Sequence, residues 1–215
     1  MIVSVSILSC DEKEYESAVR IVDRSGAEML HLDVMDGIFV VDTTYGAEMA
    51  VRLRPLTALP FDAHLMVRDP AAVLEDFIAA GADRIALHCE AAGPLPALLR
   101  RIREAGCAAG IALSPGTAVE MIEPLLPSVD FVLVMTVHPG KSSQPFISAM
   151  LDKIIKLRKI IDTRKLPVKI QADGGIGPDN IAELAAAGLD IAVSGSAVMN
   201  SNNPAEVVRK LQIVN

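Results

Sequence analysis

Residues 25–37, with the sequence SGAEMLHLDVMDG, contain the pattern that decides the fold. Gly26 follows a helical segment, at the position where a glycine in the left-handed conformation ends a helix. The next stretch, residues 29–34, is almost continuously apolar, which is typical of a strand covered on both faces of a parallel sheet. His31 and Asp33 interrupt this strand two residues apart, so their side chains point to the same face.

The same order of helix, glycine turn and apolar strand recurs along the chain. Similar glycine steps precede three further strands, at residues 80–82, 105–107 and 187–189. The apolar runs predict strands at 3–8, 29–34, 61–66, 84–88, 108–113, 131–137, 168–172 and 191–194. The segments between and after them predict helices at 12–25, 45–54, 71–80, 96–105, 118–126, 146–164, 179–187 and 205–211.

Strands that alternate with helices form βαβ units, and such units build a parallel sheet. Eight units within 215 residues favour a closed sheet over an open, doubly wound one. We therefore predict an α/β fold, a single (β/α)8 TIM barrel, with residues 1–215 forming one domain.

The composition describes an acidic chain with an aliphatic interior. Hydrophobic residues make up 51% of the chain and aromatic residues only 3%, so Ala, Val, Ile, Leu and Met must fill the core. The formal charge of −7 argues against nucleic acids and acidic membranes as partners. A small anionic substrate would have to be bound by local backbone dipoles or by a metal ion.

The three cysteines, Cys10, Cys89 and Cys107, lack CxxC spacing and indicate a reducing compartment. The first ten residues lack a basic region and are followed by acidic residues, which predicts a strand rather than a signal peptide. No apolar run approaches the roughly 18 residues that a membrane span requires. We therefore expect a cytoplasmic protein.

Four polar side chains near strand ends predict a metal site. In a (β/α)8 barrel the active site lies at the C-terminal ends of the strands. A single histidine on an apolar strand is more often a satisfied core residue, but four metal-binding side chains at strand ends favour one centre. Two imidazoles and two carboxylates suit Zn, Fe, Mn or Co. We expect one divalent ion per subunit, bound by His31, Asp33, His64 and Asp173.

The two carboxylates, Asp33 and Asp173, come from strands far apart in the barrel, so they can flank a ligand that lies across its mouth. Such a pair can remove a proton from one face of a carbon and return a proton to the other face. Beside a ketone, this chemistry is epimerisation or isomerisation through an enediolate, which a divalent metal would stabilise.

Two glycine-rich turns predict a phosphate site. They follow the last two predicted strands and contain Gly174 and Gly175, then Gly195 and Ser196. The loops after strands 7 and 8 form the recurrent phosphate site of this barrel, because their backbone N–H groups are exposed. The alternative is that these glycines only permit tight turns.

Further residues are expected to surround a substrate. Met35 and Met66 lie two residues beyond Asp33 and His64 on the same inward face, and Met135 lies inside the sixth strand. They would form a dry collar over the enediolate, or else simply fill gaps. Ser6 either reaches the substrate or packs. The remaining candidates are expected behind the metal ligands or in structural roles: His88, His138, Cys10 and Cys89.

Together these motifs resemble the ribulose-phosphate 3-epimerase family. The matching stretches are SILSCD, LHLDVMDGIFV, DAHLMV, LHCE, VMTVHPG with QPFI, ADGGI and SGSAV, in the family's order from residue 6 to residue 198. The resemblance implies a ribulose-phosphate-binding (β/α)8 barrel that interconverts D-ribulose 5-phosphate and D-xylulose 5-phosphate. It also implies a homo-oligomer, a dimer or a hexamer.

The resemblance assigns roles to individual residues of this chain. Asp33 and Asp173 would be the two acid/base groups, and with His31 and His64 they would hold the metal. The implied surroundings of the substrate and its phosphate are Ser6, His64, Met35, Met66, Met135, Gly140, Gly174, Gly175, Gly195 and Ser196.

Two segments depart from the family pattern. The stretch usually written DGHFVPN is DGIFVVD here, at residues 36–42. The segment usually written NPGFGGQ is HPGKSSQ at residues 138–144, which we call the lid; it carries Lys141, Ser142 and Ser143. Loss of two glycines restricts the backbone of the lid. Because D-allulose-6-phosphate 3-epimerases resemble the chain as well, a ketohexose phosphate is the alternative substrate.

Two other classes of protein are weighed against an epimerase. A decarboxylase or aldolase generally needs a lysine at the C-terminal end of a strand. The only strand lysine, Lys169, precedes Asp173 by four residues and is expected at the opposite end of the barrel. A non-catalytic sugar-phosphate-binding barrel would not need both Asp33 and Asp173.

Overall fold

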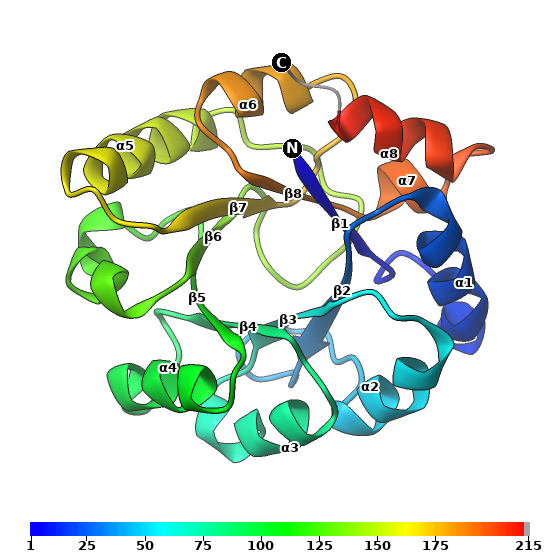
Figure 1. The fold of residues 1–215 in the computed structure, drawn as a ribbon, viewed down its shortest axis with the longest axis horizontal. Helices are drawn as coiled ribbons and strands as arrows, with labels where there is room; N and C mark the ends of the chain where they lie inside the picture. Colours follow the sequence, from blue (N-terminus) through cyan, green and yellow to red (C-terminus); the bar gives the residue numbers. More distant parts are fainter. Residues whose placement is uncertain (213–215) are drawn as a thin grey trace.

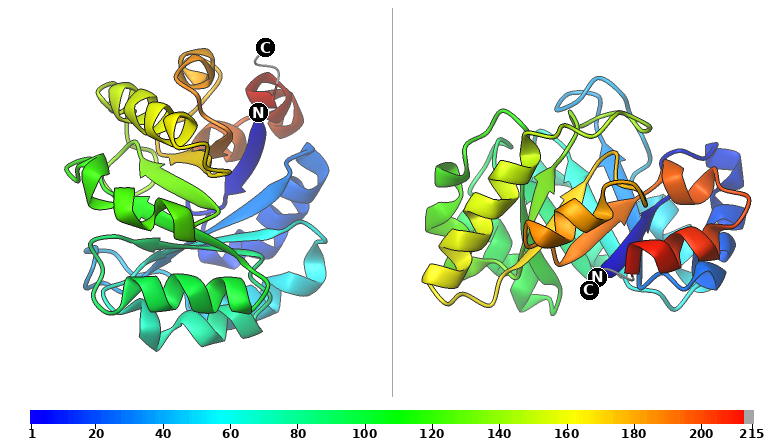
Figure 2. Two further views of the ribbon diagram at one scale, coloured as in Figure 1. Left: turned by 60° about the vertical axis from the view of Figure 1, so that its left-hand side comes forward. Right: turned by 90° about the horizontal axis from the view of Figure 1, so that it is seen from above.

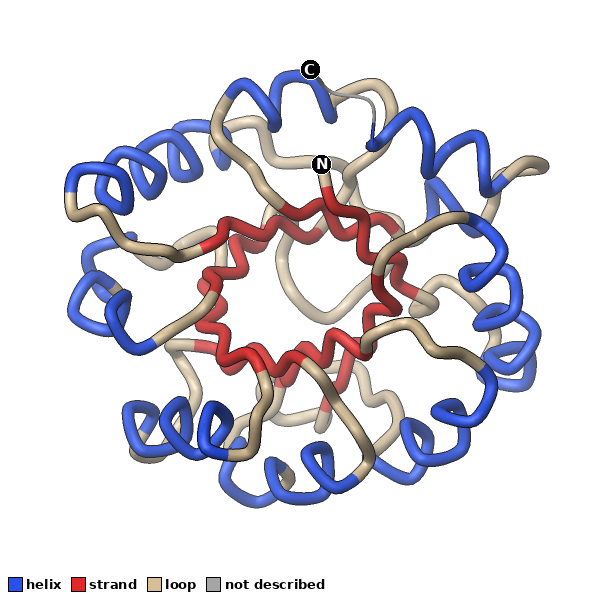
Figure 3. Tube along the Cα trace, in the orientation of Figure 1, coloured by secondary structure: helices blue, strands red, loops and turns tan. Residues whose placement is uncertain are grey.

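The computed structural model describes residues 1–212 of the chain. Eight parallel strands close into a barrel in chain order, with β1 paired to both β2 and β8 (Figures 1 and 3). The predicted (β/α)8 barrel is confirmed. The strands are β1 Ile2–Ser6, β2 Met29–Met35, β3 Phe61–Met66, β4 Arg84–His88, β5 Ala108–Leu113, β6 Phe131–Met135, β7 Lys169–Asp173 and β8 Ile191–Ser194.

Helices surround the barrel, and Figure 2 shows this outer layer from two further directions. The α-helices are α1 Tyr15–Ser25, α2 Ala47–Leu53, α3 Leu74–Ala79, α4 Leu95–Glu104, α5 Met150–Thr163, α6 Ile181–Ala186, α7 Ser196–Met199 and α8 Pro204–Gln212. Short 3-10 helices are η1 Glu12–Glu14, η2 Arg54–Leu56, η3 Pro70–Ala72, η4 Val119–Met121 and η5 Glu123–Ser128. Among the helices of residues 1–212, none combines the length and the apolar character needed to cross a bilayer.

The helix predicted at residues 118–126 is wrong. Two 3-10 helices, η4 and η5, occupy the connection between β5 and β6. Pro124 and Pro127 explain the difference, because proline lacks a backbone N–H and its ring clashes with the preceding turn of an α-helix. The predicted glycine stops are correct: Gly26, for example, ends α1 with φ 83°.

Alternation along the strands divides the buried residues into two layers. Outward side chains such as Val5, Leu32 and Ile85 pack beneath the helices in one continuous core. A smaller apolar cluster lies inside the barrel and includes Ala112 and Leu133. Burial of one large aliphatic side chain contributes about 1.5–3 kcal/mol, so the outer layer can offset the cost of the polar groups inside.

An aromatic ring and a cation fill the barrel at the end where the strands begin, which we call its lower end. The guanidinium of Arg84 lies 3.9 Å from the centroid of the Phe131 ring. The ring also requires Gly110 on the neighbouring strand, since a Cβ at that position would lie 2.2 Å from Cζ of Phe131. This filled end forms the floor beneath the polar residues described next.

Candidate active site and metal centre

The four predicted metal ligands come together at one point inside the barrel. His31 and Asp33 lie on β2, His64 lies beside Asp33 on β3, and Asp173 is the last residue of β7. Strands β2 and β3 continue to Met35 and Met66, so three of the ligands lie within strands rather than at the predicted strand ends.

The distances between the ligand atoms match those of a coordination site. All four ligand atoms lie within 4.8 Å of one another. His31 Nε2 is 3.5 Å from Asp33 Oδ1 and 3.9 Å from Asp173 Oδ2, and His64 Nδ1 is 3.4 Å and 3.6 Å from the same two oxygens. A tetrahedral ion with bonds of about 2.1 Å spaces its ligands about 3.4 Å apart.

A buried nitrogen without a partner supports the fit of a metal ion. His31 Nε2 is shielded from solvent and has no hydrogen-bond partner within the described residues. Its other ring nitrogen, Nδ1, lies 2.9 Å from Asp62 Oδ2, so in the neutral ring Nδ1 carries the proton and Nε2 has the lone pair that a metal ion would accept. A buried lone pair directed at two carboxylates suits a divalent cation.

The charges of the centre also favour a cation. Burial opposes the charged form of His31, but the carboxylates of Asp33 and Asp62 outweigh it and raise the pKa of His31 well above its usual value. Burial likewise opposes ionisation of Asp33, yet His31 and His64 lower the pKa of Asp33 far below its usual range. Because a divalent ion would replace the protons on the histidines, binding should release protons.

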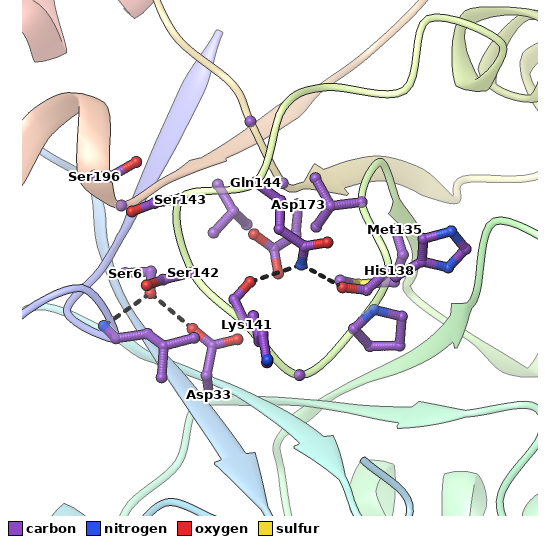
Figure 4. Close-up of a pocket in the computed structure, with 18 of the residues that line it drawn as sticks. Ser6, Asp33, Met135, His138, Lys141, Ser142, Ser143, Gln144, Asp173 and Ser196 are labelled. Carbon is purple, nitrogen blue, oxygen red and sulfur yellow. Dashed lines mark hydrogen bonds between the residues drawn. The ribbon is translucent and has the colours of Figure 1, made fainter. Parts of the chain in front are cut away.

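A pocket opens above this centre on the lid side (Figure 4). Asp33 and Asp173 both reach it, whereas His64 is fully buried and lies outside its lining. All the other residues predicted to surround a substrate do line it: Ser6, Met35, Met66, Met135, Gly140, Gly174, Gly175, Gly195 and Ser196.

Ser6 orients one of the two carboxylates. Its hydroxyl donates to Asp33 Oδ2 over 2.7 Å, as Figure 4 shows, and accepts from the backbone N–H of Leu8. The second oxygen of Asp33, Oδ1, is therefore the one that faces His31 and His64.

The glycine turns lie in close contact with their neighbours. Gly175 has φ 64°, and a Cβ on it would lie 2.5 Å from the backbone nitrogen of Phe146. A Cβ on Gly195 would lie 3.3 Å from Ser6 Cβ, so a side chain here would press on the serine that orients Asp33. The tight-turn explanation therefore accounts for Gly175 by itself, whereas at Gly195 the constraint is the close approach to Ser6.

The lid crosses the pocket with its side chains largely in solvent. Gln144 donates from Nε2 to the carbonyls of His138 and Lys141, at 2.7 Å and 2.9 Å, and so closes the lid into a loop (Figure 4). Ser143 adopts φ 59°, a left-handed conformation that costs a residue with a side chain about 1–3 kcal/mol. Lys141 is exposed at the rim.

Lys169 lies where the sequence predicts it. It starts β7 while Asp173 ends it, and its ammonium pairs with Asp190 at the opposite end of the barrel from the pocket. This position offers no support for a lysine-dependent decarboxylase or aldolase.

Asp62 is an important residue that the sequence analysis missed. Its buried carboxylate accepts hydrogen bonds from His31 Nδ1, Ser4 Oγ, Gln171 Nε2 and Arg84 Nε. The available signal was its position two residues before His64, on the same inward face of β3.

His88 lies behind His64, on the side away from the four candidate metal ligands, as predicted. Its ring is fully buried and contacts His64 on one side and Glu90 on the other. Burial lowers the pKa of His88 to about 4, so the ring is neutral near pH 7. Glu90 was not singled out from the sequence.

Residues 2–199 match the model of the ribulose-phosphate 3 epimerase family. This chain belongs to that family. A ribulose-phosphate 3-epimerase of Synechocystis sp. is 42% identical over 97% of this chain and 91% of its own length. A chloroplastic ribulose-5-phosphate-3-epimerase of Arabidopsis thaliana is 39% identical over 99% of this chain and 76% of its own length. Because the relatives carry the names of epimerases, the predicted enzyme class, an isomerase, is confirmed.

The fold is shared more widely than the family. The crystal structure of 3-hexulose-6-phosphate synthase from Salmonella typhimurium superposes with a TM-score of 0.73 at 17% identity, over 98% of this chain and 96% of that one. At this identity the likeness concerns the barrel and not the reaction.

Proposed function

We propose that this chain is a metal-dependent 3-epimerase that interconverts D-ribulose 5-phosphate and D-xylulose 5-phosphate. The observation that carries the proposal is the convergence of Asp33 and Asp173, from β2 and β7, on one centre at the base of one pocket. Membership of the epimerase family and the fit of the four ligands to a divalent ion support it.

Proton transfer at C3 is assigned to the two carboxylates. One would remove the C3 proton from one face of the sugar, and the other would return a proton to the opposite face. A bound Zn, Fe, Mn or Co ion, one per subunit, would stabilise the negative charge of the 2,3-enediolate. Ser6 keeps Asp33 oriented through its 2.7 Å hydrogen bond.

The methionines and the glycine turns are assigned to the rest of the substrate. Met35, Met66 and Met135 would exclude water from the enediolate, since water would otherwise exchange or misplace its protons. The phosphate would meet the backbone N–H groups of the two turns, together with Gly140 of the lid. The turn residues assigned to it are Gly174, Gly175, Gly195 and Ser196.

A ketohexose phosphate is the second candidate substrate. The specific reason is the lid, whose exposed Lys141, Ser142 and Ser143 all line the pocket. If these side chains reshape the space over the carbon chain, D-allulose 6-phosphate would be the better substrate of the same machinery.

The test is proton exchange at C3. The metal-loaded protein is incubated in D₂O with D-ribulose 5-phosphate and, separately, with D-allulose 6-phosphate, and the C3 proton is followed by NMR. Deuterium uptake with the pentose, giving D-xylulose 5-phosphate, supports the proposal. Uptake with the hexose alone favours the second candidate, and binding without uptake of deuterium makes the chain a non-catalytic sugar-phosphate-binding barrel.

Three further properties remain predictions. They are the organisation of residues 1–215 as one domain, assembly into a dimer or hexamer, and a cytoplasmic location. Sedimentation of the purified protein and localisation of a tagged chain would test the last two.

A further inference from the structure

A buried chain of hydrogen bonds leads from His64 away from the metal centre. The Nε2 atoms of His64 and His88 lie 2.9 Å apart, and the two rings stack with centroids 5.0 Å apart. On its far side, His88 Nδ1 lies 3.0 Å from Glu90 Oε2. Both rings are fully buried, so solvent offers neither of them another partner.

We propose that His88 and Glu90 are positioning residues that decide which nitrogen of His64 carries its proton, and so keep the lone pair on the nitrogen that faces the metal centre. This inference rests on the metal-dependent function proposed above. Both residues lie outside the four-ligand cluster and outside the lining of the pocket.

The carboxylate of Glu90 decides which atom donates and which accepts in each of these hydrogen bonds. A carboxylate only accepts hydrogen bonds, so Nδ1 of His88 carries a proton and Nε2 keeps its lone pair. Since an N–H···N bond needs one donor and one acceptor, Nε2 of His64 must donate. The other nitrogen of His64, Nδ1, then presents its lone pair to the centre, 3.4 Å from Asp33 Oδ1.

Glu90 is itself held in one orientation. Its Oε1 accepts from the backbone N–H of Ser114, at 2.8 Å, and from the hydroxyl of Thr117. Lys153 fixes the same loop by donating to the carbonyls of Ser114, Pro115 and Thr117. Because a backbone N–H can only donate, the atom of residue 90 that faces Ser114 has to be an acceptor.

The two histidines therefore reach the centre through opposite nitrogens. His31 has a carboxylate, Asp62, directly on Nδ1 and uses Nε2, whereas His64 uses Nδ1 and has its carboxylate one imidazole further away. A carboxylate fixes the protonated nitrogen of both histidines. It does so directly for His31 on β2, and through the ring of His88 for His64 on β3.

Replacement of Glu90 by glutamine should exchange donor and acceptor in the hydrogen bonds that join residue 90, His88 and His64. The amide oxygen must face the N–H of Ser114, so the amide NH₂ would face His88 and donate to its Nδ1. His88 would then be protonated on Nε2, and His64 would carry its proton on Nδ1, toward the metal. Glu90→Ala leaves room for water, which can accept from His88 Nδ1 as readily as it can donate, so the original direction stays open and a metal on His64 Nδ1 favours it.

The affinity for Zn²⁺ measures the consequence, by competition with a chromophoric chelator. We expect Glu90→Gln to lose at least about tenfold in affinity and Glu90→Ala to lose less. A purely structural role for Glu90 gives the opposite order, because alanine removes more contacts than glutamine. The matched control is Glu75→Gln, on α3, where an exposed glutamate pairs with Arg101; it should match the wild type.

Long-range ¹H–¹⁵N NMR of the zinc-loaded, histidine-labelled protein provides a second readout. The proposal requires protons on Nδ1 of His88 and Nε2 of His64 in the wild type, and a proton on Nε2 of His88 in Glu90→Gln. A wild-type His88 protonated on Nε2, or a glutamine variant with unchanged affinity, overturns it. Deuterium exchange at C3 by the wild type is measured alongside: if exchange is normal, only the positioning role fails, and if none of Zn, Fe, Mn and Co binds, both proposals fail.

Discussion

The floor of the candidate site and the lid above it are held in different ways. On the floor, strand alternation directs each polar side chain inward, and Asp62 alone joins His31, Ser4, Gln171 and Arg84. The lid is an exposed loop closed by the side chain of Gln144, with Ser143 in a strained conformation. The comparison teaches that strand geometry fixes the polar centre, whereas the lid is an exposed loop held by contacts of its own.

The largest effect on turnover should come from replacing Asp173, which lies at the edge of the floor next to the pocket. Asp173→Asn removes one of the two acid/base groups, so kcat for C3 epimerisation should fall by about 10²–10⁴-fold or more. The side chain is only partly buried, so the melting temperature should stay close to that of the wild type. Turnover is measured by NMR and folding by circular dichroism; an active Asn variant would refute the two-base assignment.

Removal of the metal should also abolish turnover without loss of the fold. Chelation should eliminate C3–H exchange, and added Fe, Mn, Co or Zn should restore it, since all four accept this ligand set. The metal content is verified by elemental analysis before each assay. Full activity in a sample shown to be free of metal would contradict the assignment.

Loss of Asp62 tests the floor as a structure. Asp62→Ala leaves the cation of Arg84 and the ring of His31 without their buried partner, so the free energy of unfolding should fall by about 3–5 kcal/mol. Urea denaturation measures the change, and Asp152→Asn, an exposed position on α5, is the control. A loss below about 1 kcal/mol would mean that water replaces the carboxylate.

A substitution in the lid should have the smallest effect on stability, and its effect on function should be confined to the choice between the two sugar phosphates. Ser143→Gly relieves the left-handed strain and frees the lid, so kcat/KM for the pentose phosphate should rise relative to that for the hexose phosphate. Stability should change by less than about 1 kcal/mol. Lys165→Gly is the matched control, because Lys165 has φ 52° at the end of α5, away from the pocket. Equal changes in both variants would exclude a role of the lid in selectivity.

The same contrast explains what the sequence could predict. Apolar runs that alternate with helical segments, together with glycine stops, were sufficient for eight strands and a closed barrel, and places near strand ends grouped His31, Asp33, His64 and Asp173. The connection at residues 118–126 was missed because its apolar spacing resembles that of a helix, while Pro124 within it and Pro127 just beyond it disfavour one.

The hydrogen-bonding pattern of the floor could not be predicted in the same way. Which nitrogen of His31 or His64 faces the centre depends on partners from other strands, Asp62 and His88, and on their register. Periodicity within one strand carries no information about a neighbouring strand's register, so these contacts become visible only when the barrel closes.

The candidate metal centre opens toward the pocket beneath the lid, and the opposite side of it is filled by side chains. Arg84 and Phe131 block the lower end, and of the four ligands only Asp173 has appreciable exposure, 16% against at most 3% for the others. An ion held there would arrive and depart by the route that the sugar phosphate takes, so a bound substrate would trap it. The identity of the resident metal would then record which ion reached the newly folded chain first, and not only which ion binds most tightly.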